Sequence, residues 1–300
     1  RYENSTALVR TFHTQAGTLT DRLTRFKPGV GYGIDPDPHW EERLVKSMSD
    51  LACLPFLLPQ PSPQDYLDLV AIQNEVGTRG LVNFYVNSAI DHGAGWCMDI
   101  EDLMVASIKQ PELVRGLLSI FHEYTMAQTA CALEAGVEVI FCPFYFASLS
   151  VGWSPGFYRD FILPLVKEHV DLVHAAGGLY HYYDDGKVTK ILPWLAECGV
   201  DLLSTLPPPP VGDVDLAEVK AAYGDRICFN GNIDIVNVIK HGTPDLIREQ
   251  VRQAILAAAE GGGFILGTSD SIREAPQENV AAFFRAGRDY GCYRRLGQAR

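Results

Sequence analysis

The chain has 300 residues, of which 47% are hydrophobic and 21% are charged, a balance that predicts a globular fold with a substantial core. Its formal net charge of -12 argues against a nucleic-acid partner or an anionic membrane surface, since both are bound through clustered lysine and arginine. No apolar run approaches the roughly 20 residues of a membrane-spanning helix. The seven cysteines form no CxxC pair and no signal-like segment follows Arg1, so we expect a cytoplasmic protein.

The first part of the chain, residues 1–79, shows little regular patterning. A patch rich in Gly, Pro and Asp at residues 28–38 predicts a surface loop or hairpin. From residue 80 onward, runs rich in β-branched and aromatic residues alternate with stretches of helical periodicity. We therefore expect strands at residues 81–86, 137–141, 179–185, 200–205, 226–229 and 263–266.

Helical stretches separate these strands. One begins near Ile100, breaks at Pro111 and stops at Gly136, and both Ser154 and Thr243 precede a proline, as the N-cap of a helix often does. Further helices are expected to end near residue 199 and to cover residues 215–223 and 276–290, with a stiff proline loop at 207–210. Six successive βα units predict an α/β fold of the (β/α)8 TIM-barrel type. Because nothing marks a domain boundary, we predict one domain over residues 1–300, with an irregular N-terminal part at 1–79.

The strand at 179–185 carries the first group of candidate catalytic residues. Side chains alternate between the faces of a strand, so His181, Tyr183 and Asp185 share one face. In a parallel barrel the carboxyl ends of the strands converge on one mouth, where active sites lie. These residues would place a base, a hydroxyl and a carboxylate in that mouth. The alternative is that His181 and Tyr183 are hydrogen-bonded core residues and that Asp185 caps the next helix.

Other strand ends supply further candidates. Asp270 follows the last strand and is predicted to face the same mouth, although a turn or helix cap is its alternative role. Asn230 and Asn232 flank Gly231, where they would either bind a polar substrate or form a turn. His181, Asp185 and Asp270 are also candidate metal ligands, since imidazole and carboxylate bind zinc, but no HxxEH or HxH pattern supports a metal. The remaining candidate substrate-binding residues are Tyr145, Ser269, Arg273 and His92.

Seven stretches of the chain between residues 80 and 291 carry a family resemblance, at residues 111–136, 154–164, 198–201, 215–220, 241–244, 260–266 and 275–280. Together they resemble the uroporphyrinogen decarboxylase superfamily. Membership implies a (β/α)8 barrel, and the superfamily includes true decarboxylases and corrinoid-linked methyltransferases.

The resemblance also implies which residues occupy the family's functional positions. Zinc-dependent methyltransferases of this family carry His-x-Cys-Gly at a strand end and a second Cys before the closing helix. Aligning Gly186 with that glycine places Tyr183 and Asp185 at the His and Cys positions, and Asp270 at the second Cys. Because both thiolates are replaced, a thiol-activating zinc is disfavoured and an oxygen-rich or metal-free acid/base site is favoured. The decarboxylase branch is less well matched: its arginine-rich N-terminal signature is absent, and the Asp expected after the strand at 137–141 is replaced by residues 142–145.

These observations predict a corrinoid-dependent methyltransferase. It would move a methyl group between a small methoxylated substrate and cobalamin carried by a partner protein, and the resemblance also implies a homodimer. Cleaving an ether requires a general acid, for which the candidates are Asp185, Asp270, Tyr183 and His181. One alternative is a cofactor-independent decarboxylase, in which Arg273 would bind a substrate carboxylate. Another is a non-catalytic barrel that binds a ligand.

Overall fold

The computed structural model describes residues 3–29 and 36–292 and divides into two compact units. The hairpin unit comprises Arg1–Pro61 and Ser88–Ala127, and the sheet unit comprises Ser62–Asn87 and Gln128–Arg300. Whether the two units act as the single predicted domain stays a prediction. No helix among the described residues combines the length and the apolar character needed to cross a membrane.

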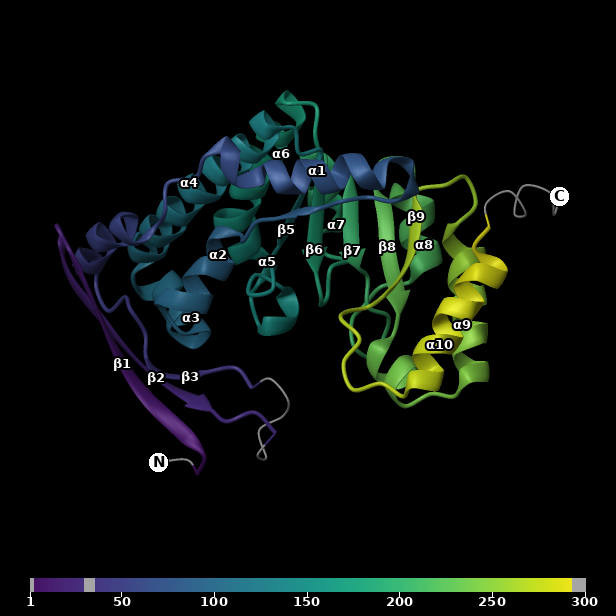
Figure 1. Ribbon diagram of the computed structural model, residues 1–300, viewed down its shortest axis with the longest axis horizontal. Helices are drawn as coiled ribbons and strands as arrows, with labels where there is room; N and C mark the ends of the chain where they lie inside the picture. The colour runs from purple at the N-terminus through teal and green to yellow at the C-terminus, as the bar shows by residue number, and fades with distance from the viewer. Residues whose placement is uncertain (1–2, 30–35, 293–300) are drawn as a thin grey trace. The chain divides into compact units, whose positions relative to one another are not determined.

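The sheet unit contains a parallel sheet whose strands follow one another in chain order (Figure 1). This order is that of a barrel, because a doubly wound sheet reverses direction at a switch point. The α/β fold and all six predicted strands are thus confirmed. Within residues 3–29 and 36–292 the parallel sheet has these six strands, whereas a complete (β/α)8 barrel has eight. The strands are β4 (Phe84–Tyr85), β5 (Val139–Pro143), β6 (Leu179–Asp184), β7 (Leu202–Thr205), β8 (Cys228–Ile233) and β9 (Phe264–Thr268).

Helices connect the strands where the sequence predicts them. Ser154, Asp215 and Thr243 each cap a helix, because their side-chain oxygens accept backbone N–H groups of the first turn. α6 packs against β6, α9 packs against β8 and β9, and α8 and α10 both pack against α9. The helices of this unit are α1 (Leu67–Val76), α5 (Pro155–Phe157), α6 (Leu163–Ala175), α7 (Leu192–Cys198), α8 (Leu216–Tyr223), α9 (Pro244–Ala258) and α10 (Gln277–Tyr290), with π-helical turns at Tyr158–Ile162 and Ile235–Lys240.

The two faces of β6 differ as alternation predicts. Tyr180 and Tyr182 are fully buried on the face toward the helices. The hydroxyl of Tyr182 is hydrogen-bonded to that of Tyr158 (2.9 Å), and the hydroxyl of Tyr180 to His169 Nδ1 (3.3 Å). His181 and Tyr183 consequently point to the opposite face, which in a barrel is the interior.

The hairpin unit corrects the expectation that residues 1–79 are irregular. β1 (Ser5–Thr14), β2 (Gly17–Phe26) and β3 (His39–Glu42) form an antiparallel sheet in that order. The loop or hairpin predicted at 28–38 lies partly outside the described residues. The other elements of this unit are the 3-10 helix η1 (Met48–Leu57), α2 (Ala89–His92), a π-helical turn at Gly93–Cys97, α3 (Ile100–Lys109) and α4 (Pro111–Ala135), whose last turns belong to the sheet unit.

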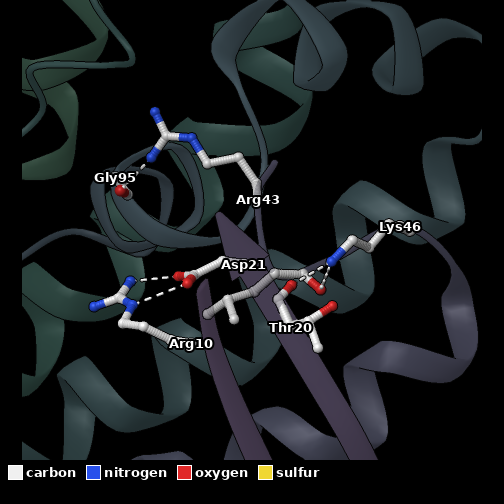
Figure 2. Close-up of polar contacts among 7 residues, drawn as sticks. Arg10, Thr20, Asp21, Arg43, Lys46 and Gly95 are labelled. Atoms are coloured by element: carbon white, nitrogen blue, oxygen red, sulfur yellow. Dashed lines mark hydrogen bonds and ion pairs between the residues drawn. The ribbon is translucent and has the colours of Figure 1, made fainter. Parts of the chain in front are cut away.

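An ion pair links the two long strands of the hairpin unit. Arg10 and Asp21 are direct cross-strand partners, and Arg10 Nε donates to Asp21 Oδ1 at 2.9 Å (Figure 2). Lys46 lies nearby and donates to the carbonyl oxygen of Thr20. The Asp21 carboxylate is wholly buried, so Arg10 supplies the charge that compensates for its lost hydration.

We expect Arg10→Ala to lower the free energy of unfolding by about 1–3 kcal/mol, because it leaves a buried carboxylate without its charged donor. Chemical denaturation of the variant measures this loss. Arg159→Ala is the control: Arg159 pairs with Asp160 where both side chains are at least half exposed, and such a pair contributes about 0–1 kcal/mol. Equal losses in the two variants would contradict a stabilising role for Arg10.

Candidate active site

A hydrogen bond joins the end of β6 to the segment that follows β9. The hydroxyl of Tyr183 donates to Asp270 Oδ1 at 2.8 Å, although β7 and β8 lie between these two strands in the sheet. The Tyr183 ring is held edge-on by Phe141 and Tyr145, with centroids 5.6 and 5.1 Å away. The structure therefore brings two predicted catalytic residues into direct contact at the carboxyl ends of the strands.

Asp185 belongs to the same group of side chains. Burial raises the pKa of its carboxyl group, and the negative charge of Asp270 raises it further. Burial and the hydrogen bond to Asp270 also raise the pKa of the Tyr183 hydroxyl. Asp185 thus holds its proton more tightly than an ordinary aspartate, and Asp270 accepts the hydrogen bond of the Tyr183 hydroxyl. Asp185 does not cap the following helix, since α7 begins at Leu192 with Ile191 as its N-cap.

His181 lies one strand repeat deeper and has other partners. Its Nδ1 is hydrogen-bonded to Asn83 Oδ1 (3.1 Å) and its Nε2 to Ser204 Oγ (2.7 Å). Burial lowers the pKa of His181 to about 4, so the imidazole is neutral at pH 7. The structure therefore gives His181 the environment of a hydrogen-bonded core residue.

The donor set does not suit zinc. Both ring nitrogens of His181 are engaged, which leaves the carboxylates of Asp185 and Asp270 among the predicted ligands. Structural and catalytic zinc sites take three or four ligands, usually thiolate or imidazole. Within residues 3–29 and 36–292, no group of three or more His, Cys, Asp or Glu side chains is placed to hold a metal ion.

The predicted substrate-binding residues fall in several places. Asn230 lies in β8, with its Oδ1 against the backbone of Gly267 in β9. Ser269 is buried, and its hydroxyl accepts the N–H of Ile235, so it joins the segments after β8 and β9. β8 runs through Asn230, Gly231 and Asn232, so the alternative of an Asn-Gly turn is wrong.

Asn232 is associated with a different hollow. It lines a pocket of about 450 Å³ that is bounded by the 208–217 segment and by α9. Arg273 is exposed in the loop before α10. The structure thus brings Tyr145, Tyr183, Asp185 and Asp270 together but places Asn232 at a separate pocket.

His92 belongs to the hairpin unit. Its ring stacks on Phe121 with centroids 5.0 Å apart and lies edge-on to Trp96 at 5.6 Å. Burial lowers its pKa to about 4, and both ring nitrogens lack a hydrogen-bond partner among the described residues. Its assignment to substrate binding stays a prediction.

Sequence reasoning missed one residue beneath the site, Asp184. Asp184 is fully buried, and its Oδ2 has no partner among the described residues. Burial raises the pKa of Asp184 to about 7, against the opposing effect of a hydrogen bond from Ser148. The alternation of side chains along β6 places Asp184 on the side that faces the helices. The sequence pattern does not indicate that this carboxyl group is buried and has a raised pKa.

The comparisons with known proteins place this chain in one family. Residues 93–290 match the family model described as uroporphyrinogen decarboxylase (URO-D). A uroporphyrinogen decarboxylase from Synechococcus sp. (strain CC9902) is 31% identical over 96% of this chain and 82% of its own length. The barrel-type α/β chain belongs to the uroporphyrinogen decarboxylase family, a family of enzymes.

The chain is also similar to two methyltransferases. The methylated-thiol--coenzyme M methyltransferase of Methanosarcina mazei is 23% identical over 64% of this chain and 49% of its own length. The solved structure of a methyltransferase from Methanosarcina mazei superposes with a TM-score of 0.64 at 20% identity, over 85% of this chain and 73% of that one, which shows a shared fold. Among the uroporphyrinogen decarboxylases, the chain spans between 39% and 82% of the relative's length.

Proposed function

We propose that this protein is a methyltransferase that passes a methyl group from a small methoxylated substrate to a corrinoid carried by a partner protein. The observation that carries the proposal is the pairing of Asp185, whose pKa is raised, with Asp270, which accepts the Tyr183 hydroxyl at 2.8 Å. Cleavage of an ether requires a general acid, and a carboxyl group whose pKa is raised is suited to that role.

Each of these three residues has a role in the proposed reaction. As the bond between the methyl carbon and the ether oxygen breaks, its electron pair stays on the oxygen, and Asp185 donates a proton there. Asp270 raises the pKa of the Asp185 carboxyl group through its charge and fixes the Tyr183 ring through the hydrogen bond. The reduced corrinoid supplies the nucleophile that takes the methyl group. The corrinoid is a co-substrate in this proposal, so none of the three residues has to act as its ligand.

The fold and the chemistry of the strand ends support this proposal together. The methyltransferase from Methanosarcina mazei shares the fold, and the related coenzyme M methyltransferase acts, by its name, on methylated thiols. Tyr183, Asp185 and Asp270 offer oxygen atoms in place of thiolates. We infer that the donor here is an oxygen ether, activated by protonation rather than by a metal.

Decarboxylation is the second candidate, because the chain is 31% identical to a uroporphyrinogen decarboxylase over 96% of its length. Such an enzyme needs cations to bind the carboxylates of its substrate. Lys187 and Arg273, which are close to the acidic pair in sequence, are both exposed, and neither forms an ion pair with any residue of 3–29 or 36–292. Cys142 and Pro143, buried at the end of β5, stand where the resemblance leads us to expect an aspartate.

An anaerobic absorbance assay distinguishes the two candidates. The protein is mixed with reduced cobalamin and a panel of methoxylated compounds, with methylamines and methylthiols as comparison donors. We expect methylcobalamin to form with a methoxylated donor and not with the comparison donors. Release of carbon dioxide from uroporphyrinogen, with no methylation in the presence of a corrinoid protein, would overturn the proposal in favour of decarboxylation.

The effect of Asp270 on Asp185 gives a prediction for the pH profile of this assay. Only protonated Asp185 can donate, so the rate is full below its pKa and falls as the pH rises through it. Asp270→Asn removes the charge that raises this pKa, and the fall should therefore move to lower pH. Measuring kcat/KM against pH in the wild type and the variant tests this. An unchanged alkaline limb would contradict the electrostatic coupling of the two carboxyl groups.

A further inference from the structure

The turn that presents Asp185 is held by four consecutive backbone amides. The N–H groups of residues 186–189 donate in order to Asp184 Oδ1, to Ser150 Oγ and, for the last two, to Asp213 Oδ1. The four N···O distances are 2.9, 2.8, 3.0 and 3.3 Å. No helix or strand supplies these bonds, so side chains replace the usual backbone partners throughout the turn.

The three acceptors approach the turn from different elements. Asp184 ends β6 itself, Ser150 lies in the 3-10 turn at Leu149–Val151 after β5, and Asp213 lies in the loop after β7. β5 and β7 are the two neighbours of β6 in the sheet. The turn is therefore tied to the segments on both of its sides.

The surroundings leave the turn little room to move. A Cβ atom at Gly186 would overlap the hydroxyl oxygens of Ser148 and Ser150, so the backbone passes directly against these serines. On the other side, the Thr189 hydroxyl donates to Asp213 Oδ2 at 2.5 Å, which engages the second oxygen of that carboxylate. The turn is thus fixed by close packing as well as by hydrogen bonds.

We propose that Ser150, Asp184 and Asp213 are positioning residues that fix Asp185 in place opposite Asp270. We call their three side chains the turn brace. The inference rests on the proposed function for the role of Asp185, and it deepens that function by assigning its geometry to residues that do not touch the substrate. A catalytic acid must be held close to its productive position, because a displacement of about 1 Å can cost on the order of 100-fold in rate.

Three variants test the turn brace. Asp213→Ala removes the acceptor of two turn amides. Asp213→Asn keeps an amide oxygen that can accept both N–H groups. Asp215→Ala is the matched control: Asp215 Oδ1 also accepts two backbone N–H groups, at 2.9 and 3.0 Å, but these belong to the first turn of α8. Hydrogen–deuterium exchange of peptides covering 186–189 and the kinetics of methyl transfer are measured for each.

We expect Asp213→Ala to speed exchange at Val188 and Thr189 by about tenfold or more and to lower kcat by about tenfold or more. Its KM should change less than about threefold, because Asp185 acts when the bond breaks. Asp213→Asn should restore exchange and kcat to within about threefold of the wild type. Asp215→Ala should leave both unchanged, although its melting temperature falls.

The outcomes separate the turn brace from the proposed function. Unchanged exchange in Asp213→Ala would show that the turn is held without Asp213. Faster exchange with unchanged kcat would show that the turn brace holds the turn but does not serve Asp185, and this would overturn the positioning role while methyl transfer stands. A wild type that transfers no methyl group would refute the proposed function, and the positioning role with it, while the exchange data still report whether the turn is held.

Discussion

Asp185→Asn is expected to lower kcat for methyl transfer from a methoxylated donor by about 100-fold to 10,000-fold, the range that a general acid contributes. Asparagine matches the shape of aspartate but has no acidic proton to give to the leaving oxygen. The absorbance change on methylation of reduced cobalamin measures the loss. KM should stay within about threefold, because the proton moves only as the ether bond breaks.

The loss should depend on the leaving group. A donor whose oxygen leaves readily, such as a nitro-substituted methoxybenzene, needs less protonation and should lose much less activity in Asp185→Asn than an alkyl methyl ether. Asp225→Asn is the matched control, since its carboxylate lies on the surface with 78% of the side chain exposed. If Asp185→Asn kept its activity to within about twofold on the alkyl ether, Asp185 would not be the acid.

The parallel sheet could be predicted because its strands are rich in β-branched and aromatic residues and lie between Gly, Pro or capping residues. Strands buried on both faces read as continuous hydrophobic segments, and β5 is of this kind. The helix starts at Ser154, Asp215 and Thr243 follow from local capping chemistry, which depends on a few neighbouring residues.

The hairpin at the N-terminus could not be predicted in the same way. A strand shows an alternation of apolar and polar residues only where one of its faces is buried. β1 has no buried residue along its ten positions. β2 buries Leu19, Asp21 and Leu23 at a spacing of two, together with Thr24, but the polar Asp21 and Thr24 interrupt the apolar pattern. Its register instead follows from the two-residue connection at 15–16, before a Gly17 with φ of 146°.

Alternation also explains why His181 and Tyr183 were grouped together. They share a face of β6, but two residues along a strand are about 6–7 Å apart, enough to separate a buried layer from the rim. Asn83 and Ser204 are the partners that place His181 in the core, and they lie 98 and 23 residues away along the chain. The sequence pattern around His181 does not indicate partners that lie so far away along the chain.

The turn brace could not be predicted from the sequence for a related reason. Asp213 and Thr189 are 24 residues apart and meet only because β6 and β7 are neighbours in the sheet. From the sequence, Asp213 is one of several acidic residues in a loop after four prolines. The order of the strands could be predicted. The hydrogen bonds between loop side chains and backbone amides could not, because they depend on loop conformations that the strand order does not determine.

Asp184→Asn is expected to change how the stability of the protein depends on pH. Burial raises the pKa of Asp184 to about 7 in the folded protein, whereas an unfolded aspartate titrates near about 3.9. Between these values the folded state keeps a proton that the unfolded state releases. The contribution of Asp184 to stability is therefore full below about pH 4 and is lost as the pH rises toward 7.

Asparagine cannot ionise, so the variant is spared this loss. Relative to the wild type, Asp184→Asn should gain up to about 4 kcal/mol in free energy of unfolding between pH 4 and pH 8, the equivalent of a shift of about three pKa units. Urea denaturation of both proteins at several pH values measures the difference, and Asp225→Asn serves again as the exposed control. A difference that stays flat across this range would mean that the Asp184 carboxylate is ionised in the folded protein at low pH. In that case the oxygen that lacks a partner here would have to be solvated or paired.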